Sequence, residues 1–392
     1  MLPLYYEYHN PVKILSGEAA LENIPYELHA LEAHAPLLLS DQGLKQVGAV
    51  DTVLHAMSPM IPKATFTDIP ADSSVAVVNQ IAAYYKEQGC DSILAVGGGS
   101  VIDTAKGVRM VISQNTDNIE SLMGCEVLTA GRHIPFLAVP TTAGTGSEVT
   151  PVAVISNPQK QVKQEYLSAH LLPDAAILDL RMTMTLPPKV TASTGIDALC
   201  HAIESFTCLQ KNPMSDAYAA GAIPLIMRYL PIAAAHPGNK EARMAMANAS
   251  LMAGTSFGNS MVGLVHAIGH ALGGVCHVAH GDAMSILLPH VMAYNLDKCR
   301  SGYSDLLLHL AGPERYCSTP ADHRAEKAVE VVTEFVASFA PYGLPMTLKD
   351  TGRVNPDQFR QVAETAISDG AIIVNPKAAG IPEILTILKE AF

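Results

Sequence analysis

The chain changes character at Leu186-Pro187-Pro188, and this change constrains its fold more than any other feature. Before that point, short apolar runs alternate with helical stretches, which is the pattern of a parallel sheet covered by helices. After it, strand-like runs end and long helical segments follow one another. The sequence therefore predicts an α/β domain over residues 1–185 and an all-α domain over residues 186–392. A chain of 392 residues is long enough to give each domain its own core.

Periodicity and helix-start signals give the predicted elements in more detail. In the first domain, strands are expected at 12–15, 35–40, 92–96, 134–139, 152–156 and 175–179, and helices at 73–88 and 101–111. In the second domain, helices are expected at 190–208, 213–235, 240–260, 264–273, 282–297, 302–311, 321–340, 355–368 and 382–391.

The charge balance excludes two classes of partner. The formal net charge is −12, only 16% of residues are charged, and 49% are hydrophobic. Nucleic acids and anionic membrane surfaces are bound by clustered Lys and Arg, and no such cluster stands out. We therefore expect neither nucleic acid nor a membrane as a partner.

The cysteines and the N-terminus indicate a cellular location. Seven cysteines are scattered without a CxxC pair, so we expect free thiols in a reducing compartment. The N-terminal stretch MLPLYYEYHN lacks the basic and apolar regions of a signal peptide. The sequence contains no run of about 18 uninterrupted apolar residues, so we expect no membrane-spanning helix. A cytoplasmic protein is expected.

A glycine-rich loop follows the strand predicted at 92–96. Gly97-Gly98-Gly99-Ser100 would let the backbone approach a pyrophosphate and present amides at the start of a helix. Ser100 could cap that helix or donate to a phosphate oxygen. Three glycines in a tight turn are a weak signal, and a plain turn is an equal alternative.

Two further segments strengthen the cofactor interpretation. The segment 140–148, PTTAGTGSE, also follows a predicted strand and combines four hydroxyls with two glycines. Asp41 ends another strand, where a carboxylate can accept hydrogen bonds from an adenosine ribose and repel a 2′-phosphate, which favours NAD over NADP. An Asx turn is the structural alternative for Asp41. Asp41 precedes the glycine loop, whereas the usual fingerprint has its acid about 20 residues after the loop, so a Rossmann-like variant is expected.

Spacing singles out five candidate metal ligands between residues 197 and 280. Asp197 and His201 are spaced i,i+4 on one predicted helix, and His266 and His270 repeat this spacing on another. His280 follows after a glycine-rich turn. A single histidine on an apolar helix is more often a hydrogen-bonded core residue, but two pairs and His280 together favour a metal site. Spacing alone does not say which four of the five are ligands.

The motifs of this chain resemble those of the iron-containing (group III) alcohol dehydrogenase family along nearly the whole sequence. They are SDQGL at 40–44, GGGSVIDTAK at 97–106, PTTAGTGSEVT at 140–150, LPPKVTASTGIDALCHAIESF at 186–206, GLVHAIGHALGG at 263–274 and HGDAMSILLPHVMAYN at 280–295. The resemblance implies a Rossmann-like dinucleotide-binding domain, an all-α metal-binding domain in a dehydroquinate-synthase-like fold, and an active site in the cleft between them.

The resemblance also implies roles for individual residues. The matching metal ligands are Asp197, His201, His266 and His280, while His270 matches a histidine near the metal and becomes the candidate catalytic residue for proton relay or substrate orientation. The positions expected to bind the cofactor are Asp41, Gly98, Gly99, Ser100, Asp103, Thr141, Thr142, Thr145, Ser147 and Lys163. Two departures from the family pattern concern substrate preference and packing: Met284-Ser285 after His280, and Ala271 where proline is common.

The implied reaction is the reversible oxidation of a small alcohol to an aldehyde or ketone, with NAD as hydride acceptor. The metal is expected to be Fe²⁺, with Zn²⁺ as the alternative, and the resemblance implies a homodimer or higher homo-oligomer. The rival is a metal- and NAD-dependent lyase of the dehydroquinate-synthase type, whose phosphorylated substrates need basic residues near the metal. Lys and Arg are absent from residues 244–297, which disfavours that lyase.

Overall fold

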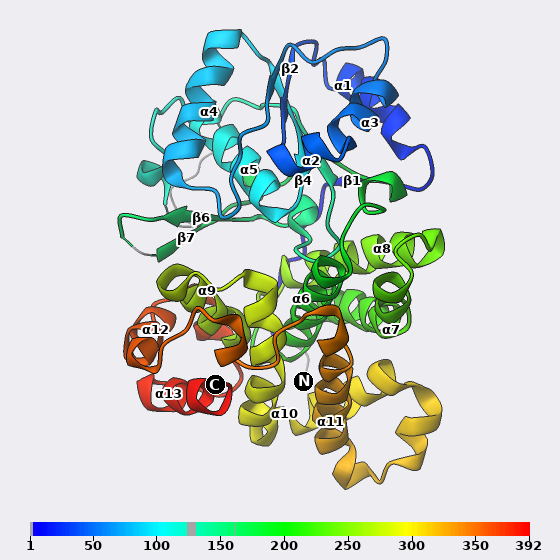
Figure 1. The fold of residues 1–392 in the computed structure, drawn as a ribbon, viewed down its shortest axis with the longest axis vertical. Helices are drawn as coiled ribbons and strands as arrows, with labels where there is room; N and C mark the ends of the chain where they lie inside the picture. Colours follow the sequence, from blue (N-terminus) through cyan, green and yellow to red (C-terminus); the bar gives the residue numbers. More distant parts are fainter. Residues whose placement is uncertain (1–2, 124–130, 161) are drawn as a thin grey trace. The chain divides into compact units, whose positions relative to one another are not determined.

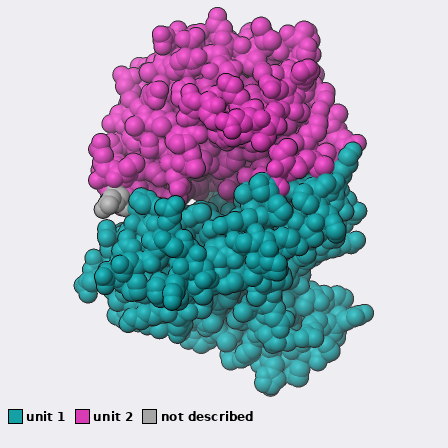
Figure 2. Space-filling model, in the orientation of Figure 1, with its two compact units in different colours: residues 1–8, 187–392 teal, residues 9–186 magenta. Residues whose placement is uncertain are grey.

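The computed structural model describes residues 3–123, 131–160 and 162–392, which form two compact units. One unit runs from His9 to Leu186, and the other contains residues 187–392 together with the N-terminal segment 3–8 (Figure 2). The sequence had assigned that N-terminal segment to the first domain. The structure instead groups it with the helical unit, where Tyr8 stacks on Tyr218 with ring centroids 6.1 Å apart.

A six-stranded parallel sheet forms the centre of the first unit (Figure 1). Its strands, in spatial order, are β1 (Lys13–Ser16), β8 (Ala175–Leu178), β5 (Phe136–Pro140), β4 (Ser92–Gly97), β2 (Pro36–Leu39) and β3 (Ala64–Phe66). Every neighbouring pair is parallel. Because β2, β4 and β5 are adjacent, the segments that follow them meet at one edge of the sheet, where ligands of open α/β sheets bind.

Helices cover both faces of this sheet. Leu37 and Leu39 of β2 pack with α4 (Val75–Gln88) and α5 (Gly99–Ser113) in one buried cluster. Leu38 points to the other face and packs with α1 (Ile24–Ala30) and α3 (Ala49–Ala56). This alternation explains why the strands are almost continuously apolar, since both of their faces are buried.

The structure corrects several sequence expectations in the first unit. The segment predicted at 152–156 is β6 (Val152–Asn157), but it pairs antiparallel with β7 (Val162–Leu167) in a separate two-stranded sheet. Strands β3 and β7, and helices α1 and α3, were not predicted. Strand β3 has only three residues and β7 is rich in polar residues, so neither shows the apolar run used to detect strands.

The second unit is a bundle of helices (Figure 1). Its α-helices are α6 (Pro188–Thr207), α7 (Pro213–Ala235), α8 (Lys240–Phe257), α9 (Leu264–Cys276), α10 (His280–Ser318), α11 (Arg324–Ala337), α12 (Phe359–Ala366) and α13 (Ile381–Glu390). Helix α6 packs against α7, α8 and α10, and α9 packs against α10 and α12.

The helix predictions for this unit need one correction. The sequence separated 282–297 from 302–311, whereas the structure continues α10 through both segments to a break at Gly312, where φ is 80° and ψ is 171°. Residues 298–301 contain neither proline nor glycine, and Cys299 is buried against the bundle, so nothing interrupts the helix there.

Helix α7 is long and apolar enough, by length and composition, to cross a membrane, which the sequence search for uninterrupted apolar runs did not detect. It packs against α6 and α8 and carries Asp216 and Arg228. Its apolar side chains therefore contribute to the packing of the bundle. The six described cysteines are free thiols, as expected, and Cys125 lies outside the described residues.

Candidate functional site

Helix α6 carries three acidic or imidazole side chains on one face. Asp197, His201 and Glu204 are spaced i, i+4 and i+7, so they stack along the helix. All three are buried. Ionisable groups in such surroundings need a charged or hydrogen-bonding partner to offset the cost of desolvation.

Two other helices bring three histidines to this face. His266 and His270 lie on α9, and His280 is the first residue of α10. The start of α10 lies close to α6 because Gly281 has no side chain. A Cβ on Gly281 would lie 2.9 Å from the carbonyl oxygen of Ser193, so only glycine permits this approach.

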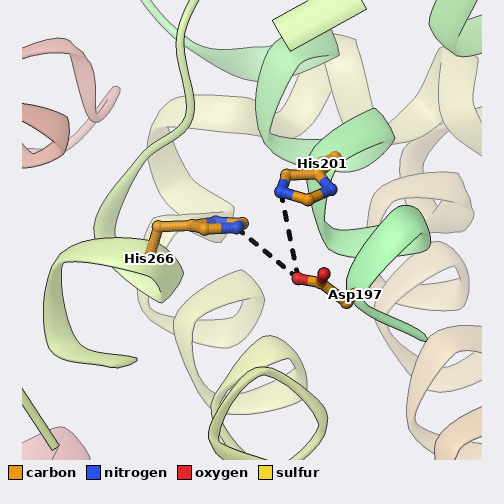
Figure 3. Close-up of side chains that lie close together, drawn as sticks. All are labelled: Asp197, His201 and His266. Carbon is orange, nitrogen blue, oxygen red and sulfur yellow. Dashed lines mark ion pairs between the residues drawn. The ribbon is translucent and has the colours of Figure 1, made fainter. Parts of the chain in front are cut away.

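The histidines surround a single carboxylate oxygen. Asp197 Oδ1 lies 3.9 Å from His201 Nε2, 3.7 Å from His266 Nε2 and 3.4 Å from His280 Nε2. Ligand atoms of Asp197, His201 and His266 all lie within 4.8 Å of one another (Figure 3). Asp197 Oδ1 and His266 Nε2 are buried, and neither has a hydrogen-bond partner among the described residues.

These distances and charges fit a divalent metal ion. Metal–nitrogen and metal–oxygen bonds of about 2.0–2.2 Å in tetrahedral geometry separate ligand atoms by roughly 3.4 Å. Burial alone would raise the pKa of Asp197, but His201 and His280 outweigh it and hold that pKa well below its usual range. A bound cation would use the two polar atoms that lack hydrogen bonds and would offset the buried negative charge.

Two neighbours that the sequence analysis missed orient the histidines. Glu204 accepts a hydrogen bond from Nδ1 of His266 at 2.5 Å. The ring of Phe257 stacks on His201, with centroids 4.2 Å apart and an angle of 18° between the planes. The sequence could have indicated Glu204, because it lies seven residues after Asp197 and therefore on the same face of the helix. Phe257, on a different helix, gave none.

His270 has a carboxylate partner of its own. Its Nδ1 lies 2.8 Å from Asp369 Oδ2. Asp369 also caps the short helix η10 (Gly370–Val374) by accepting a hydrogen bond from the Ala371 amide. The ring of His270 stacks on His280, with centroids 5.4 Å apart. The histidine at the i+4 position from His266 therefore lies beside the cluster and is held by a separate acid.

The two predicted cofactor loops contact each other at the end of the parallel sheet. A Cβ on Gly98 would lie 3.2 Å from Thr142 atoms, and a Cβ on Gly99 would lie 2.9 Å from Thr145 Cγ2. The Thr141 amide donates to the Gly97 carbonyl at 3.0 Å, which joins the loops after β4 and β5. The two loops therefore meet at the start of α5, and the N-terminus of a helix favours phosphate.

Asp41 follows β2, the strand that neighbours β4 in the sheet. Its Oδ1 accepts a hydrogen bond from the Leu44 amide at 2.9 Å and caps α2 (Gln42–Gln46). The Asx turn considered from the sequence is therefore present. This cap occupies one carboxylate oxygen and is compatible with a ribose contact through the other.

Asp103 links the two loops through its side chain. It accepts hydrogen bonds from Ser147 Oγ at 2.5 Å and from the Val154 amide at 3.0 Å. The ammonium of Lys106 lies 3.6 Å away and is fully buried, and burial lowers its pKa to about 8 despite Asp103 and Glu148. These contacts favour a positioning role for Asp103 and Ser147.

Lys163 is held near the glycine loop by an acid. Its ammonium forms an ion pair with Asp72 at 2.8 Å, and the Asp72 amide donates to Ser100 Oγ at 3.2 Å. Asp72 therefore contacts both Lys163 and Ser100. Asp72 has a positive φ of 53° and lies in a segment where no functional residue was predicted.

Local contacts account for one of the two departures from the family pattern, Met284-Ser285. Met284 is fully buried, and a Cβ on Gly269 would lie 1.9 Å from its Cε, so the methionine fills the space beside this glycine between α9 and α10. Ser285 Oγ donates to the Gly281 carbonyl at 2.7 Å. Ala271 is buried in α9, and nothing in the structure explains the absence of proline there.

Two family models match the chain. One, described as iron-containing alcohol dehydrogenase, matches residues 11–180, and the other, described as the C-terminal part of the Fe-containing alcohol dehydrogenase family, matches residues 191–392. A 1,3-propanediol dehydrogenase of Klebsiella pneumoniae is 36% identical over 390 residues, which cover 99% of each chain. The NAD-dependent methanol dehydrogenase of Bacillus methanolicus is 32% identical and covers 97% of this chain and 98% of its own.

Solved structures agree with these matches. The crystal structure of a 1,3-propanediol oxidoreductase has a TM-score of 0.93 at 35% identity and covers 99% of this chain and 100% of its own. A sulfoacetaldehyde reductase from Bifidobacterium kashiwanohense, in complex with NAD⁺, has a TM-score of 0.85 at 28% identity, with 99% of each chain covered. The predicted fold class, a Rossmann-like α/β domain and an all-α domain, is confirmed. The chain belongs to the iron-containing alcohol dehydrogenase family, and it is an oxidoreductase that interconverts alcohols and carbonyl compounds.

Proposed function

We propose that this enzyme oxidises a small alcohol with NAD as hydride acceptor, and that Asp197, His201, His266 and His280 hold a divalent metal ion. The observation that carries the metal proposal is the buried oxygen of Asp197, which has no hydrogen-bond partner among the described residues and lies 3.4–3.9 Å from three imidazole nitrogens. Bound metal would polarise the alcohol oxygen and lower its pKa, and NAD would accept the hydride.

On the cofactor side, each segment would recognise one part of NAD. The backbone at Gly98, Gly99 and Ser100 would donate to the pyrophosphate at the start of α5. Asp41 would accept hydrogen bonds from the adenosine ribose and disfavour a 2′-phosphate. Asp103, Lys163 and the hydroxyl-bearing loop would complete the binding site. The loop residues are Thr141, Thr142, Thr145 and Ser147.

The proton of the alcohol needs an acceptor, and His270 is proposed for this role. It is held through Nδ1 by Asp369 at 2.8 Å, and its ring stacks on the proposed ligand His280, which places it beside the proposed metal site. An imidazole is suited to such transfer because its unperturbed pKa lies near the working pH. His270 is therefore proposed as the catalytic residue, separate from the four ligands.

The substrate is proposed to be a small uncharged alcohol or diol and the corresponding aldehyde or ketone. Residues 244–297 contain no Lys or Arg, so this segment has no cation for a carboxylate or phosphate on the substrate. The relatives named for 1,3-propanediol and methanol fit this class. We also propose a cytoplasmic homo-oligomer, either a homodimer or a larger assembly.

A substrate panel tests the proposal. Protein stripped of metal by a chelator is reloaded separately with Fe²⁺ or Zn²⁺, and NADH formation is measured with methanol, ethanol, 1,3-propanediol and a hydroxy acid. We expect NADH only after reloading, and only with the uncharged alcohols. Full turnover by the stripped protein would contradict the metal role. Absence of net NADH with every alcohol after reloading would contradict the proposed oxidation and favour a lyase, in which NAD is regenerated within each turnover.

A further inference from the structure

The N-terminus of α9, the helix that carries His266, is capped by side chains from elsewhere in the unit. The Leu264 amide donates to Asn375 Oδ1 at 3.2 Å, and the Val265 amide donates to Glu204 Oε1 at 2.7 Å. Gly263, at the position before the helix, supplies no side-chain cap. The first amides of a helix have no partner within the helix, so these two contacts fix where α9 begins.

Glu204 uses its second oxygen on the side chain of the same helix. Oε2 accepts from Nδ1 of His266 at 2.5 Å, while Oε1 holds the backbone one residue earlier. Glu204 and His266 are both buried, with 6% and 3% of their surface exposed. One carboxylate therefore contacts both the backbone and the ring of a proposed metal ligand.

Gly263 makes this arrangement possible. A Cβ at Gly263 would lie 3.1 Å from Glu204 Oε1 and 3.0 Å from Asn375 Oδ1, closer than nearly all real contacts of that kind. Asn375 is itself fixed by two reciprocal hydrogen bonds with Asn295, at 3.0 and 2.9 Å. The close approach of the two capping groups to α9 thus depends on the missing side chain.

We propose that Glu204 is a positioning residue that sets the tautomer of His266 for metal binding. A carboxylate only accepts hydrogen bonds, so Nδ1 of His266 must carry the proton and Nε2 must present its lone pair. Nε2 is the atom that lies 3.7 Å from Asp197 Oδ1 and has no hydrogen-bond partner among the described residues. This inference rests on the metal site of the proposed function and adds the group that orders it.

The replacement Glu204→Gln separates this role from capping alone. Glutamine has the same shape as glutamate, but it has one acceptor oxygen and one donor NH₂ group where glutamate has two acceptor oxygens. If its oxygen stays on the Val265 amide, its NH₂ group faces Nδ1 of His266 and favours the tautomer with the proton on Nε2, the metal-facing nitrogen. If the amide flips, the ring keeps its tautomer but the helix loses its cap. Neither orientation serves both contacts.

The matched control is Asn375→Ala. It removes the other cap of the same helix end and the pairing with Asn295, and it leaves the contact between Glu204 and His266 in place. A second test variant, Gly263→Ala, pushes on the Glu204 carboxylate without changing its charge; it also pushes on Asn375, whose separate effect the Asn375→Ala control measures. This variant also tests the contact if Glu204→Gln does not fold.

The experiment measures metal affinity without turnover. Metal-free full-length protein is titrated with Co²⁺ and Zn²⁺ against a chelator of known affinity, the Co²⁺ absorption bands are recorded, and Tm is measured without metal. We expect Glu204→Gln to bind about 10- to 100-fold more weakly, the range seen for partners of metal-bound histidines, with altered Co²⁺ bands. Gly263→Ala should weaken binding in the same direction. Asn375→Ala should lower Tm and keep its affinity within about 3-fold of wild type, because the contact with His266 persists.

Two results would overturn the proposal. One is wild-type affinity with an unchanged Tm in Glu204→Gln, or wild-type affinity in Gly263→Ala where the first variant does not fold or keeps its affinity with a lowered Tm. The other is equal loss of affinity in the Asn375→Ala control, since Glu204 would then act only through the stability of the helix end. A wild-type protein that binds neither cation would instead contradict the metal site of the proposed function, before any variant is compared.

Discussion

The proposed role of Asp41 in cofactor choice gives a prediction that the structure makes sharper. Asp41 carries a negative charge and also caps α2 through the Leu44 amide. A replacement that removes both features confounds selectivity with local backbone order. Asp41→Asn removes the charge and keeps an acceptor oxygen for the cap, whereas Asp41→Gly removes the whole side chain.

The expected size follows from the half-buried position of Asp41. Two unit charges about 4 Å apart interact by roughly 1 kcal/mol in water and roughly 4 kcal/mol near a protein surface. Repulsion of a 2′-phosphate should fall in that interval, so removing the charge should narrow the ratio of NAD to NADP kcat/KM by about 10-fold or more. Loss of the helix cap in Asp41→Gly should lower the free energy of unfolding by only a few tenths of a kcal/mol.

The assay compares kcat/KM for both cofactors in wild type and the two variants, at one ionic strength because salt screens exposed charges. Wild type should prefer NAD, and both variants should lose much of that preference. A wild type that prefers NADP would refute the assignment. A change in Asp41→Gly without one in Asp41→Asn would show that the backbone, and not the charge, sets selectivity.

The other predictions concern the metal cluster and the helix contact at Gly281. His201→Ala should lose tight metal binding and turnover together, which metal analysis of the purified protein checks; full occupancy with normal activity would make His201 a core histidine. His270→Ala should keep its metal and lose roughly 10- to 10⁴-fold in activity. His266→Ala should lose both metal and activity. A His270→Ala protein without metal would contradict the assignment of His270 as a residue that does not bind the metal. Gly281→Ala should lower the free energy of unfolding by about 1–3 kcal/mol in denaturant, because the new Cβ would clash with the Ser193 carbonyl. An unchanged unfolding midpoint would show that α6 and α10 can move apart at this contact.

The sequence predicted the elements that have strong local signals. Helix α7 begins at Pro213 and ends at Ala235, as its periodicity indicated. The helix after the glycine loop and the strand before it also lie where predicted, within a few residues. Strand β3 could not be found this way, because it has three residues and exists through pairing with β2 earlier in the chain. Strand β7 pairs with the adjacent β6, but its polar residues hide the apolar pattern of a strand.

The same limit applies within the candidate site. Asp197, His201 and Glu204 share one face of one helix, so their proximity follows from helix geometry and could be predicted from the sequence. Asp369 lies 99 residues from His270 in sequence, and no local pattern connects the two. Partners of this kind depend on how η10 packs beside α9.

The two histidines of α9 show why spacing alone left the ligands ambiguous. His266 and His270 lie one turn apart and both use Nδ1 to meet a carboxylate, so the two imidazoles have the same local chemistry. Their difference comes from what the opposite nitrogen faces. For His266, Nε2 is buried 3.7 Å from the Asp197 oxygen. The position of α6 thus distinguishes His266, a proposed ligand, from His270, a proposed proton carrier. A variant that changes Glu204 without moving α6 tests whether His266 also needs its carboxylate partner to bind metal.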